Sequence, residues 1–194
     1  MTKKFDAKKL DKLNDPRRLK FQSPDLIWDR LNLQSPRVLV EIGAGTGFFA
    51  LPFSKKMNGG RLYACDVSSE MIAWMEKNIA LNHREAIVPL EMVENKVPLP
   101  GGIADLVYMI NVHHELEAPA VLLAEAGRLL KAGGKLAIID WKKEEAPVGP
   151  RASRRVSEEV VRKQVLAAGF SNLDLADVLP YHYFLIAAKG DNGK

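Results

Sequence analysis

Residues 38–49 constrain this chain more than any other stretch. An apolar, β-branched run leads to Glu41, and Gly43, Gly45 and Gly47 then alternate with small residues. Such a run is typical of a buried parallel strand. Glycines allow a sharp turn and a close approach by a ligand, and the N–H groups of a following helix would face that ligand. The stretch predicts a strand, a glycine turn and a helix at a ligand site; a tight turn without a ligand is the alternative.

A second strand, predicted at residues 61–66, ends in another acid, Asp66. A carboxylate at the tip of the second strand, roughly 20 residues beyond the first glycine, holds a ribose diol in nucleotide-type sites. Asp66 could equally cap the helix that starts near Ser68. The glycine spacing is Gly-x-Gly-x-Gly and lacks the extra residue of dinucleotide-binding turns, so we do not expect NAD to bind.

The bulk composition predicts one globular domain. A chain of 194 residues with 47% apolar and 27% charged residues can bury a full core. No apolar run reaches the roughly 18–20 residues that span a bilayer. The charged N-terminus lacks an apolar signal segment, so we expect a cytoplasmic protein. The single Cys65 cannot form an intrachain disulfide and is expected to fill core space.

The positive charge is concentrated at the N-terminus. Residues 1–20 hold eight lysines and arginines against three aspartates, although the net charge of the whole chain is only +4. The rest of the chain is therefore nearly neutral. A basic segment of this kind is either a solvated helix face or a contact for an anionic partner.

Strands and helices alternate along the chain. We expect strands at residues 37–42, 61–66, 86–93, 104–110, 135–140, 172–178 and 182–188. We expect helices at about 24–33, 47–57, 68–82, 119–130 and 157–168, after short helical pieces broken at Asp15-Pro16. This order predicts an α/β fold with a doubly wound, Rossmann-like, seven-stranded and mostly parallel sheet. Helices would cover both faces, and the last two strands would form an antiparallel hairpin at one edge.

The motifs together resemble those of class I S-adenosylmethionine-dependent methyltransferases over roughly residues 20–189. Residues 41–47 resemble the first motif of that family, and residues 66–68 resemble its ribose-binding strand end. Residues 97–107 and 129–134 resemble the segments before its fourth and fifth strands. The pattern is similar to the quinone-biosynthesis and small-molecule branch, known as type 11. Residues 35–190 would form the cofactor-binding domain, after a helical segment at residues 1–34.

The resemblance implies S-adenosylmethionine as cofactor, with the glycines admitting its methionine part and Asp66 holding its ribose. The implied cofactor-binding residues are Glu41, Gly43, Ala44, Gly45, Gly47, Asp66, Val67, Met71, Glu94, Asn95, Asn111 and Val112.

Several of these residues have a more specific expected role. Glu41 would order the turn by accepting backbone N–H bonds. Val67 and Met71 would flank the adenine. Many relatives have an acid at the position of Val93, and here Glu94 or Asn95 would take its place. Asn111 and Val112 would lie near the methyl group.

His113 and His114 are the candidate catalytic bases, because an acceptor hydroxyl or acidic carbon must lose a proton. The alternative is a histidine at a helix start that bonds the backbone. No metal site is expected, because the His-Glu-x-x-His pattern is absent. Asp140 and Trp141 would line the acceptor pocket or belong to the core, and residues 181–183 are expected to pack within the hairpin.

Three functions compete at this stage. The favoured one is methyl transfer to a small molecule. Methylation of RNA or protein is the second, suggested by the basic segment and by Arg151, Arg154 and Arg155, although Asn-Pro-Pro-Tyr is absent after the fourth strand. The third is a non-catalytic protein that binds S-adenosylmethionine. Nucleic acid is an unlikely partner on these grounds, and the oligomeric state and the acceptor are left open.

The apolar residues of segment 5–34 suggest a further role. They are too many for a free tail, and helices before the first strand cover the acceptor in the resembling family. The segment would be a lid with Phe21 near the cofactor, or a helix docked permanently on the flank of the sheet.

Overall fold

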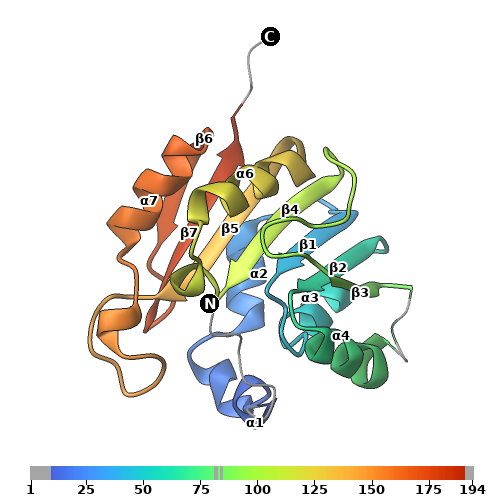
Figure 1. Ribbon diagram of the computed structural model, residues 1–194, viewed down its shortest axis with the longest axis horizontal. Coiled ribbons are helices and arrows are strands. Elements are labelled where there is room, and N and C mark those ends of the chain that lie inside the picture. Colours follow the sequence, from blue (N-terminus) through green and yellow to red (C-terminus); the bar gives the residue numbers. More distant parts are fainter. Residues whose placement is uncertain (1–9, 81–82, 84, 191–194) are drawn as a thin grey trace.

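A computed structural model describes residues 10–80, 83 and 85–190 (Figure 1). The fold is a seven-stranded sheet with the strand order β3-β2-β1-β4-β5-β7-β6. The strands are β1 (Val38–Ile42), β2 (Arg61–Asp66), β3 (Ile87–Glu91), β4 (Ala104–Ile110), β5 (Leu130–Trp141), β6 (Phe170–Ala176) and β7 (His182–Lys189). Strands β1 to β5 pair in parallel, and β7 is antiparallel to both β5 and β6. The predicted α/β fold and edge hairpin are confirmed.

Short helices precede the first strand and connect the later ones. They are α1 (Leu10–Leu13), η2 (Pro16–Lys20), α2 (Pro24–Leu31), α3 (Ala50–Lys56), α4 (Ser69–Met75), the π-helical η3 (Glu76–Ala80), η4 (His113–Glu115), α6 (Pro119–Leu129), η5 (Ala152–Arg154) and α7 (Glu158–Ala167). The predicted break at Asp15-Pro16 is confirmed, because Asp15 caps η2 there. The predicted start of α2 is confirmed too, with Ser23 as its cap.

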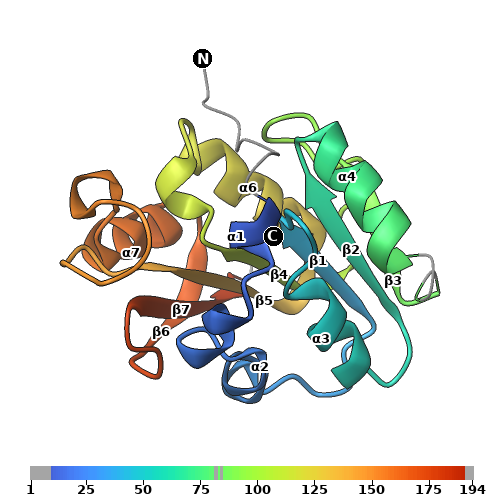
Figure 2. The ribbon, with the colours of Figure 1, turned by 90° about the horizontal axis from the view of Figure 1, so that it is seen from below.

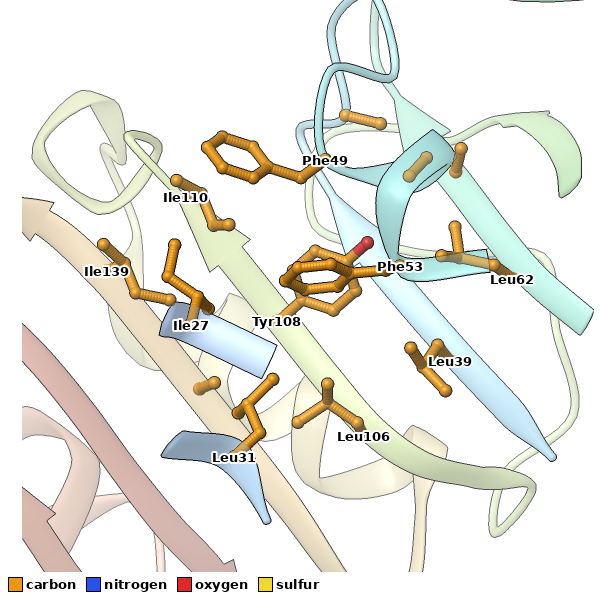
Figure 3. Close-up of a cluster of buried hydrophobic side chains, with 14 of the residues drawn as sticks. Ile27, Leu31, Leu39, Phe49, Phe53, Leu62, Leu106, Tyr108, Ile110 and Ile139 are labelled. Carbon is orange, nitrogen blue, oxygen red and sulfur yellow. The ribbon is translucent and has the colours of Figure 1, made fainter. Parts of the chain in front are cut away.

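The core lies in two layers, one on each face of the sheet. Helices α2 and α3 cover one face, and α6 and α7 cover the other (Figure 2). On the first face, Ile27 and Leu31 of α2 lie beside strand residues, and Phe53 of α3 packs against Tyr108 with ring centroids 5.1 Å apart (Figure 3). Because Ile27 and Leu31 are fully buried, α2 belongs to the same core as the sheet. The domain boundary at residue 34 stays a prediction.

Several boundaries differ from the expected ones. Helix α3 begins at Ala50, because turns occupy residues 45–49 after the glycines. Its Pro52 therefore falls in the first turn, where no intrahelical N–H bond is lost. Strand β6 begins at Phe170, since Gly169, at φ 87°, reverses the chain directly after α7. Residue 82, the expected end of the helix predicted from residue 68, and the apolar Phe5 lie outside the described residues.

Strand β5 is longer than predicted. It starts at Leu130 and includes the Lys-Ala-Gly-Gly stretch that was expected to stop the preceding helix. Gly133 has a φ of 72°, and the register with β4 shifts between Ala104 and Leu106. The glycines therefore form an irregularity inside the strand, and α6 ends one residue earlier, at Leu129.

The order of the strands defines where a ligand would bind. The connections reverse direction between β1 and β4, and open α/β sheets bind ligands outside the carboxyl ends of the strands at this point. Helices α1 and η2 lie across this edge (Figures 1 and 2). Within the described residues, no helix is long and apolar enough to cross a membrane.

Candidate functional site

The glycine turn after β1 is attached to the end of β2. The backbone N–H groups of Gly43 and Ala44 both donate to the carbonyl of Cys65, at 2.8 and 2.9 Å. The N–H of Gly45 donates to Oδ2 of Asp66 at 2.7 Å. Gly43, Gly45 and Gly47 have φ values of 73°, 56° and 71°, a region that residues with a Cβ rarely adopt. The turn predicted from the sequence is therefore present, and glycine is required by its conformation.

Asp66 joins this turn to the next helix. Its Oδ1 accepts the N–H of Ser68 at 2.9 Å, while the Ser68 side chain caps α4. Burial raises the pKa of Asp66 above its usual value, and the N–H bonds from Ser68 and Gly45 oppose this effect. A carboxylate has about four acceptor positions, so two N–H bonds leave capacity for a ligand. The cap that the sequence offered to Asp66 as an alternative is therefore supplied by Ser68, whose N–H Asp66 accepts.

Glu41 lies under the turn in an apolar environment. Its side chain is 2% exposed and accepts a hydrogen bond from the Tyr108 hydroxyl at 3.0 Å. Burial raises the pKa of Glu41 to about 8, against the Tyr108 bond and the charge of Arg18. The expected role of Glu41 as acceptor for the turn is wrong, because those N–H groups bond Cys65 and Asp66.

Residues 10–22, which we call the N-terminal strap, cover the glycine turn. The Cδ1 of Leu13 lies 3.3 Å from the position that a Cβ on Gly45 would take. Arg18 donates to the Leu13 carbonyl, and its guanidinium lies 4.3 Å from the centre of the Phe48 ring. Burial lowers the pKa of Arg18 to about 10, with the charge of Glu41 opposing this. The strap therefore places an apolar side chain and a cation against the turn.

The end of the strap binds the end of β4. Gln22 is fully buried, and its side-chain amide exchanges two hydrogen bonds with the amide of Asn111, both at 3.1 Å. Asn111 has a φ of 61°, so the chain turns sharply as it leaves the strand. The neighbouring Val112 packs on Gly43: a Cβ there would lie 2.5 Å from Val112 Cγ2. Asn111 and Val112 thus lie beside the glycine turn, and their expected place near the methyl group stays a prediction.

The residues expected on the adenine side have mixed environments. Val67 is 37% exposed, whereas Met71 is 2% exposed. Glu94, with a φ of 40°, and Asn95 form the tip of a tight turn in which Val93 and Lys96 exchange backbone hydrogen bonds. The Met92 N–H donates to the Asp66 carbonyl at 2.9 Å, which holds this turn near the end of β2.

The two candidate bases have different environments. His113 is buried, and its Nε2 lies 2.8 Å from Oε1 of Gln164 on α7. Burial lowers the pKa of His113, although Gln164 and Asp140 oppose this. His114 Nδ1 lies 2.8 Å from Oδ1 of Asp140, and its backbone N–H donates to Oδ2 of the same residue at 2.9 Å. Burial disfavours the charged form of His114, but the Asp140 bond and nearby carboxylates raise its pKa.

An aromatic cluster lies where β5 ends and β7 begins; of its members, residues 181–183 were expected only to pack within the hairpin. Trp141 and His182 are paired in register, and their ring centroids are 4.0 Å apart. Phe21 of the strap stacks on His182 with nearly parallel rings, and it contacts Trp141 and Tyr181 at about 6 Å. Sequence reasoning missed His182, since only the pairing of β5 with β7 brings it to Trp141.

Arg155 holds the loop that follows β5. It is 3% exposed and donates to the carbonyls of Lys142, Glu144, Val148 and Pro150 at 2.8–3.1 Å. Its guanidinium also lies 5.1 Å from the centre of a Trp141 ring. Arg155 is therefore a structural cation. Among the described residues, no group of three or more His, Cys, Asp or Glu side chains could hold a metal ion.

The turn suits an elongated polar ligand such as the expected cofactor. No described side chain except the tip of Leu13 lies within 4 Å of the place where a Gly45 Cβ would be. The Thr46 hydroxyl is buried without a hydrogen-bond partner in the described part of the chain. The open side of Gly45, the unsatisfied hydroxyl of Thr46 and spare acceptor positions on Asp66 fit a ligand with ribose and amino-acid groups.

Comparisons with known proteins agree with this geometry. Residues 40–138 match a family model described as a methyltransferase domain. A solved S-adenosylmethionine-dependent methyltransferase from Aquifex aeolicus is 33% identical, with a TM-score of 0.89, and the alignment covers 95% of this chain and 99% of that one.

Two curated proteins are more distant relatives. The malonyl-[acyl-carrier protein] O-methyltransferase of Hahella chejuensis is 28% identical over 70% of this chain and 50% of its own length. The ubiquinone/menaquinone biosynthesis C-methyltransferase of Laribacter hongkongensis is 28% identical over 74% of this chain and 60% of its own length. The chain thus spans about half the length of these curated relatives.

The buried Glu41 predicts a dependence of stability on pH. Its pKa rises from 4.5 to about 8 on folding, so the protonated form stabilises the fold. This stability is complete below about pH 4.5 and is lost as the pH rises through about 8. Glu41→Gln keeps an acceptor for Tyr108 but does not ionise, so it should be more stable than the wild type at about pH 9, by roughly 2–4 kcal/mol.

Thermal unfolding of both proteins at several pH values measures this difference. Glu117→Gln, at an exposed position, is the control and should follow the wild type. If the stabilities of Glu41→Gln and of the wild type change in parallel with pH, Glu41 is ionised in the folded protein.

Proposed function

The chain belongs to the methyltransferase domain family of class I S-adenosylmethionine-dependent enzymes, in its type 11 branch, and we propose that it transfers a methyl group to a small-molecule acceptor. One observation carries the proposal: the glycine turn is joined to the end of β2 by the bond from Gly45 to Asp66. This arrangement places the carboxylate proposed to bind ribose beside glycines that have no Cβ atom. The relative named as a ubiquinone/menaquinone biosynthesis C-methyltransferase supports a small-molecule acceptor.

We propose a division of the cofactor site among its elements. Gly43, Ala44, Gly45 and Gly47 receive the methionine part, with the buried Glu41 beneath them. Asp66 holds the ribose; Val67, Met71 and the turn of Glu94 and Asn95 border the adenine; Asn111 and Val112 border the methyl group. When bound, S-adenosylmethionine supplies a methyl group that leaves its sulfur, with the bonding electrons staying on sulfur, as an electron pair of the acceptor attacks.

His114 is the residue we propose as the base that accepts the proton lost by the acceptor. Asp140 holds Nδ1 of its ring, which fixes the tautomer and leaves Nε2 as the proton acceptor. His113 is a poorer candidate than the sequence suggested, since its Nε2 has the neutral Gln164 as partner and burial lowers its pKa, whereas the Asp140 carboxylate supports a charged His114. The assignment therefore follows from the partners of the two rings.

The N-terminal strap is proposed as the lid that excludes water from the reaction. It contacts the turn through Leu13 and the end of β4 through the pair of Gln22 and Asn111. These contacts join the sites expected for the cofactor and for the methyl group. A cover of this kind protects a methyl donor from water and assembles the acceptor site only when closed.

RNA or protein methylation has less support. Of the three arginines that suggested it, Arg155 is buried against backbone carbonyls. In the basic segment, Arg17 pairs with Asp15, and Arg18 faces the body of the protein. The lysines at residues 3–9 lie outside the described residues. The expected cytoplasmic location stays a prediction.

Calorimetric titration with S-adenosylhomocysteine and with NAD tests the proposed function. We expect S-adenosylhomocysteine to bind and NAD not to bind. Asp66→Ala should weaken S-adenosylhomocysteine binding by about 1.5–3 kcal/mol, because the lost hydrogen bonds are charge-assisted. Asp105→Ala is the control and should not weaken binding. Asp105 accepts the backbone N–H groups of Arg37 and Val38, at the opposite end of the strands from the proposed site. Heat from NAD and none from S-adenosylhomocysteine would refute the proposal.

Hydrogen exchange tests the lid. Residues 10–22 should exchange more slowly once S-adenosylhomocysteine is bound, because the strap then closes on an occupied site. Strand β6, at the far edge of the sheet, is the internal reference and should not change. Unchanged or faster exchange in the strap would mean that it is not a lid closed by the cofactor.

The His114–Asp140 pair predicts the titration of the base. The ring of His114 should titrate above the usual value of about 6.5 in proton-detected NMR, because Asp140 and Glu115 stabilise its charged form more than burial and Arg154 oppose it. Asp140→Asn should lower that pKa. The acidic limb of the pH–rate profile for methyl transfer should then move to lower pH.

Asp177→Asn, which removes an exposed acid paired with Lys142, should leave the His114 titration unchanged. His114→Gln should slow transfer at least about a hundredfold if His114 is the base. Normal transfer in this variant would remove His114 from the mechanism.

A further inference from the structure

His182 is a buried polar side chain without partners. It is fully buried, and neither ring nitrogen has a hydrogen-bond partner in the described part of the chain. Burial lowers the pKa of His182 to about 3, helped by nearby cations and opposed by Asp140. The ring is thus neutral at pH 7, with one N–H donor and one acceptor nitrogen. Buried polar groups normally have partners, so an exception of this kind requires an explanation.

The wall on one side of His182 is rigid. Trp141 packs against His182 at 4.0 Å, and its rings are also contacted by Arg155 and Gly149. A Cβ on Gly149 would lie 2.8 Å from the Trp141 ring, so the loop backbone is in direct contact with the indole. Arg155 fixes that loop by four backbone carbonyls. Trp141 is therefore held in place before any ligand arrives.

The wall on the other side belongs to the strap. The ring of Phe21 lies nearly parallel to that of His182, at an interplanar angle of 5° and a centroid distance of 6.1 Å. Phe21 is half-buried, whereas His182 beneath it is inaccessible. The next residue, Gln22, bonds Asn111 beside the glycine turn. Since adjacent residues are about 3.8 Å apart, Phe21 covers a place next to the proposed methyl site.

We propose that Trp141 and His182 form the floor of the acceptor site, and that a flat aromatic acceptor carrying a hydroxyl group replaces the ring of Phe21 there. The inference rests on the proposed methyl transfer and specifies its substrate class. The acceptor ring takes the place that Phe21 occupies beside the imidazole, at a centroid distance of 6.1 Å, and its hydroxyl meets the edge of the His182 ring, where it hydrogen-bonds a nitrogen in the plane of that ring. Displacement of Phe21 couples entry of the acceptor to movement of the strap.

The charges around the recess agree with a hydroxyl that becomes anionic. His182 is within electrostatic reach of Arg18, Arg155 and Lys142, and of one carboxylate, Asp140. Asp140 already accepts hydrogen bonds from His114 and from the N–H of Trp141. The cations would stabilise a phenolate or an enolate, the electron-rich form that attacks a methyl group.

Two matched probes test the proposal. The probes are 2-naphthol and 2-methylnaphthalene. They have nearly the same shape and differ only in that naphthol has a hydroxyl where methylnaphthalene has a methyl group. Their binding is measured by calorimetry in the presence of saturating S-adenosylhomocysteine. The wild type should prefer naphthol by about tenfold, the size of one hydrogen bond to a buried group. His182→Phe should remove that preference while binding methylnaphthalene as before, and His83→Phe, outside the cluster, should retain it.

A second variant and a second readout exclude a structural explanation. Phe21→Ala should bind both probes more tightly, because no side chain has to be displaced. His182→Phe should melt at the same or a higher temperature than the wild type, since it removes two unpaired buried nitrogens. If His182→Phe does not fold, the Phe21→Ala result alone decides.

Other results would overturn the proposal. Equal binding of the two probes to the wild type, a naphthol preference that survives in His182→Phe, or weaker binding to Phe21→Ala would each do so. The S-adenosylhomocysteine titration separates this failure from failure of the proposed function. Binding of S-adenosylhomocysteine without a naphthol preference refutes only the acceptor site, whereas no binding of S-adenosylhomocysteine refutes the methyl transfer itself.

Discussion

The rest of the site depends on the hydrogen bonds that attach the glycine turn to the end of β2. The parallel register places Ile42 opposite Cys65, so the turn leaves β1 just where Cys65 and Asp66 end the neighbouring strand. Their carbonyl and carboxylate take the N–H groups of Gly43, Ala44 and Gly45. Asp66 also takes the N–H of Ser68, and its carbonyl takes that of Met92. One strand end thus orients the glycine turn, helix α4 and the turn after β3.

The fold could be predicted from the sequence because its strands are short apolar runs bounded by glycine, proline and acids. These patterns involve residues that are adjacent in the sequence, so the bounds predicted for β1, β2 and β4 agree with the structure to within one residue. The start of β5 was not, since a Lys-Ala-Gly-Gly stretch suits both a helix end and an irregular strand, and only pairing with β4 decides. Likewise, only the packed core determines that Glu41 is buried against Tyr108.

The candidate site, too, could be predicted only in part from the sequence. The glycines and Asp66 could be chosen as candidates because their spacing is typical of a nucleotide-type site. His113 and His114 are adjacent in the sequence and alike in composition, yet Gln164 engages one ring and Asp140 the other. His182 carries no local signal at all. Its importance follows from two unpaired nitrogens and from contacts with Trp141 and Phe21, which are distant in the sequence.

The strap unites the two halves of the site. Its first part, at Leu13 and Arg18, contacts the glycine turn and its aromatic neighbours, and its last part, at Phe21 and Gln22, contacts β4, β5 and β7. Only seven residues separate Leu13 from Phe21, and five of them form η2. A movement of one part is therefore transmitted to the other. We therefore expect the ligands proposed for the glycine turn and for His182 to affect each other's binding through this one segment.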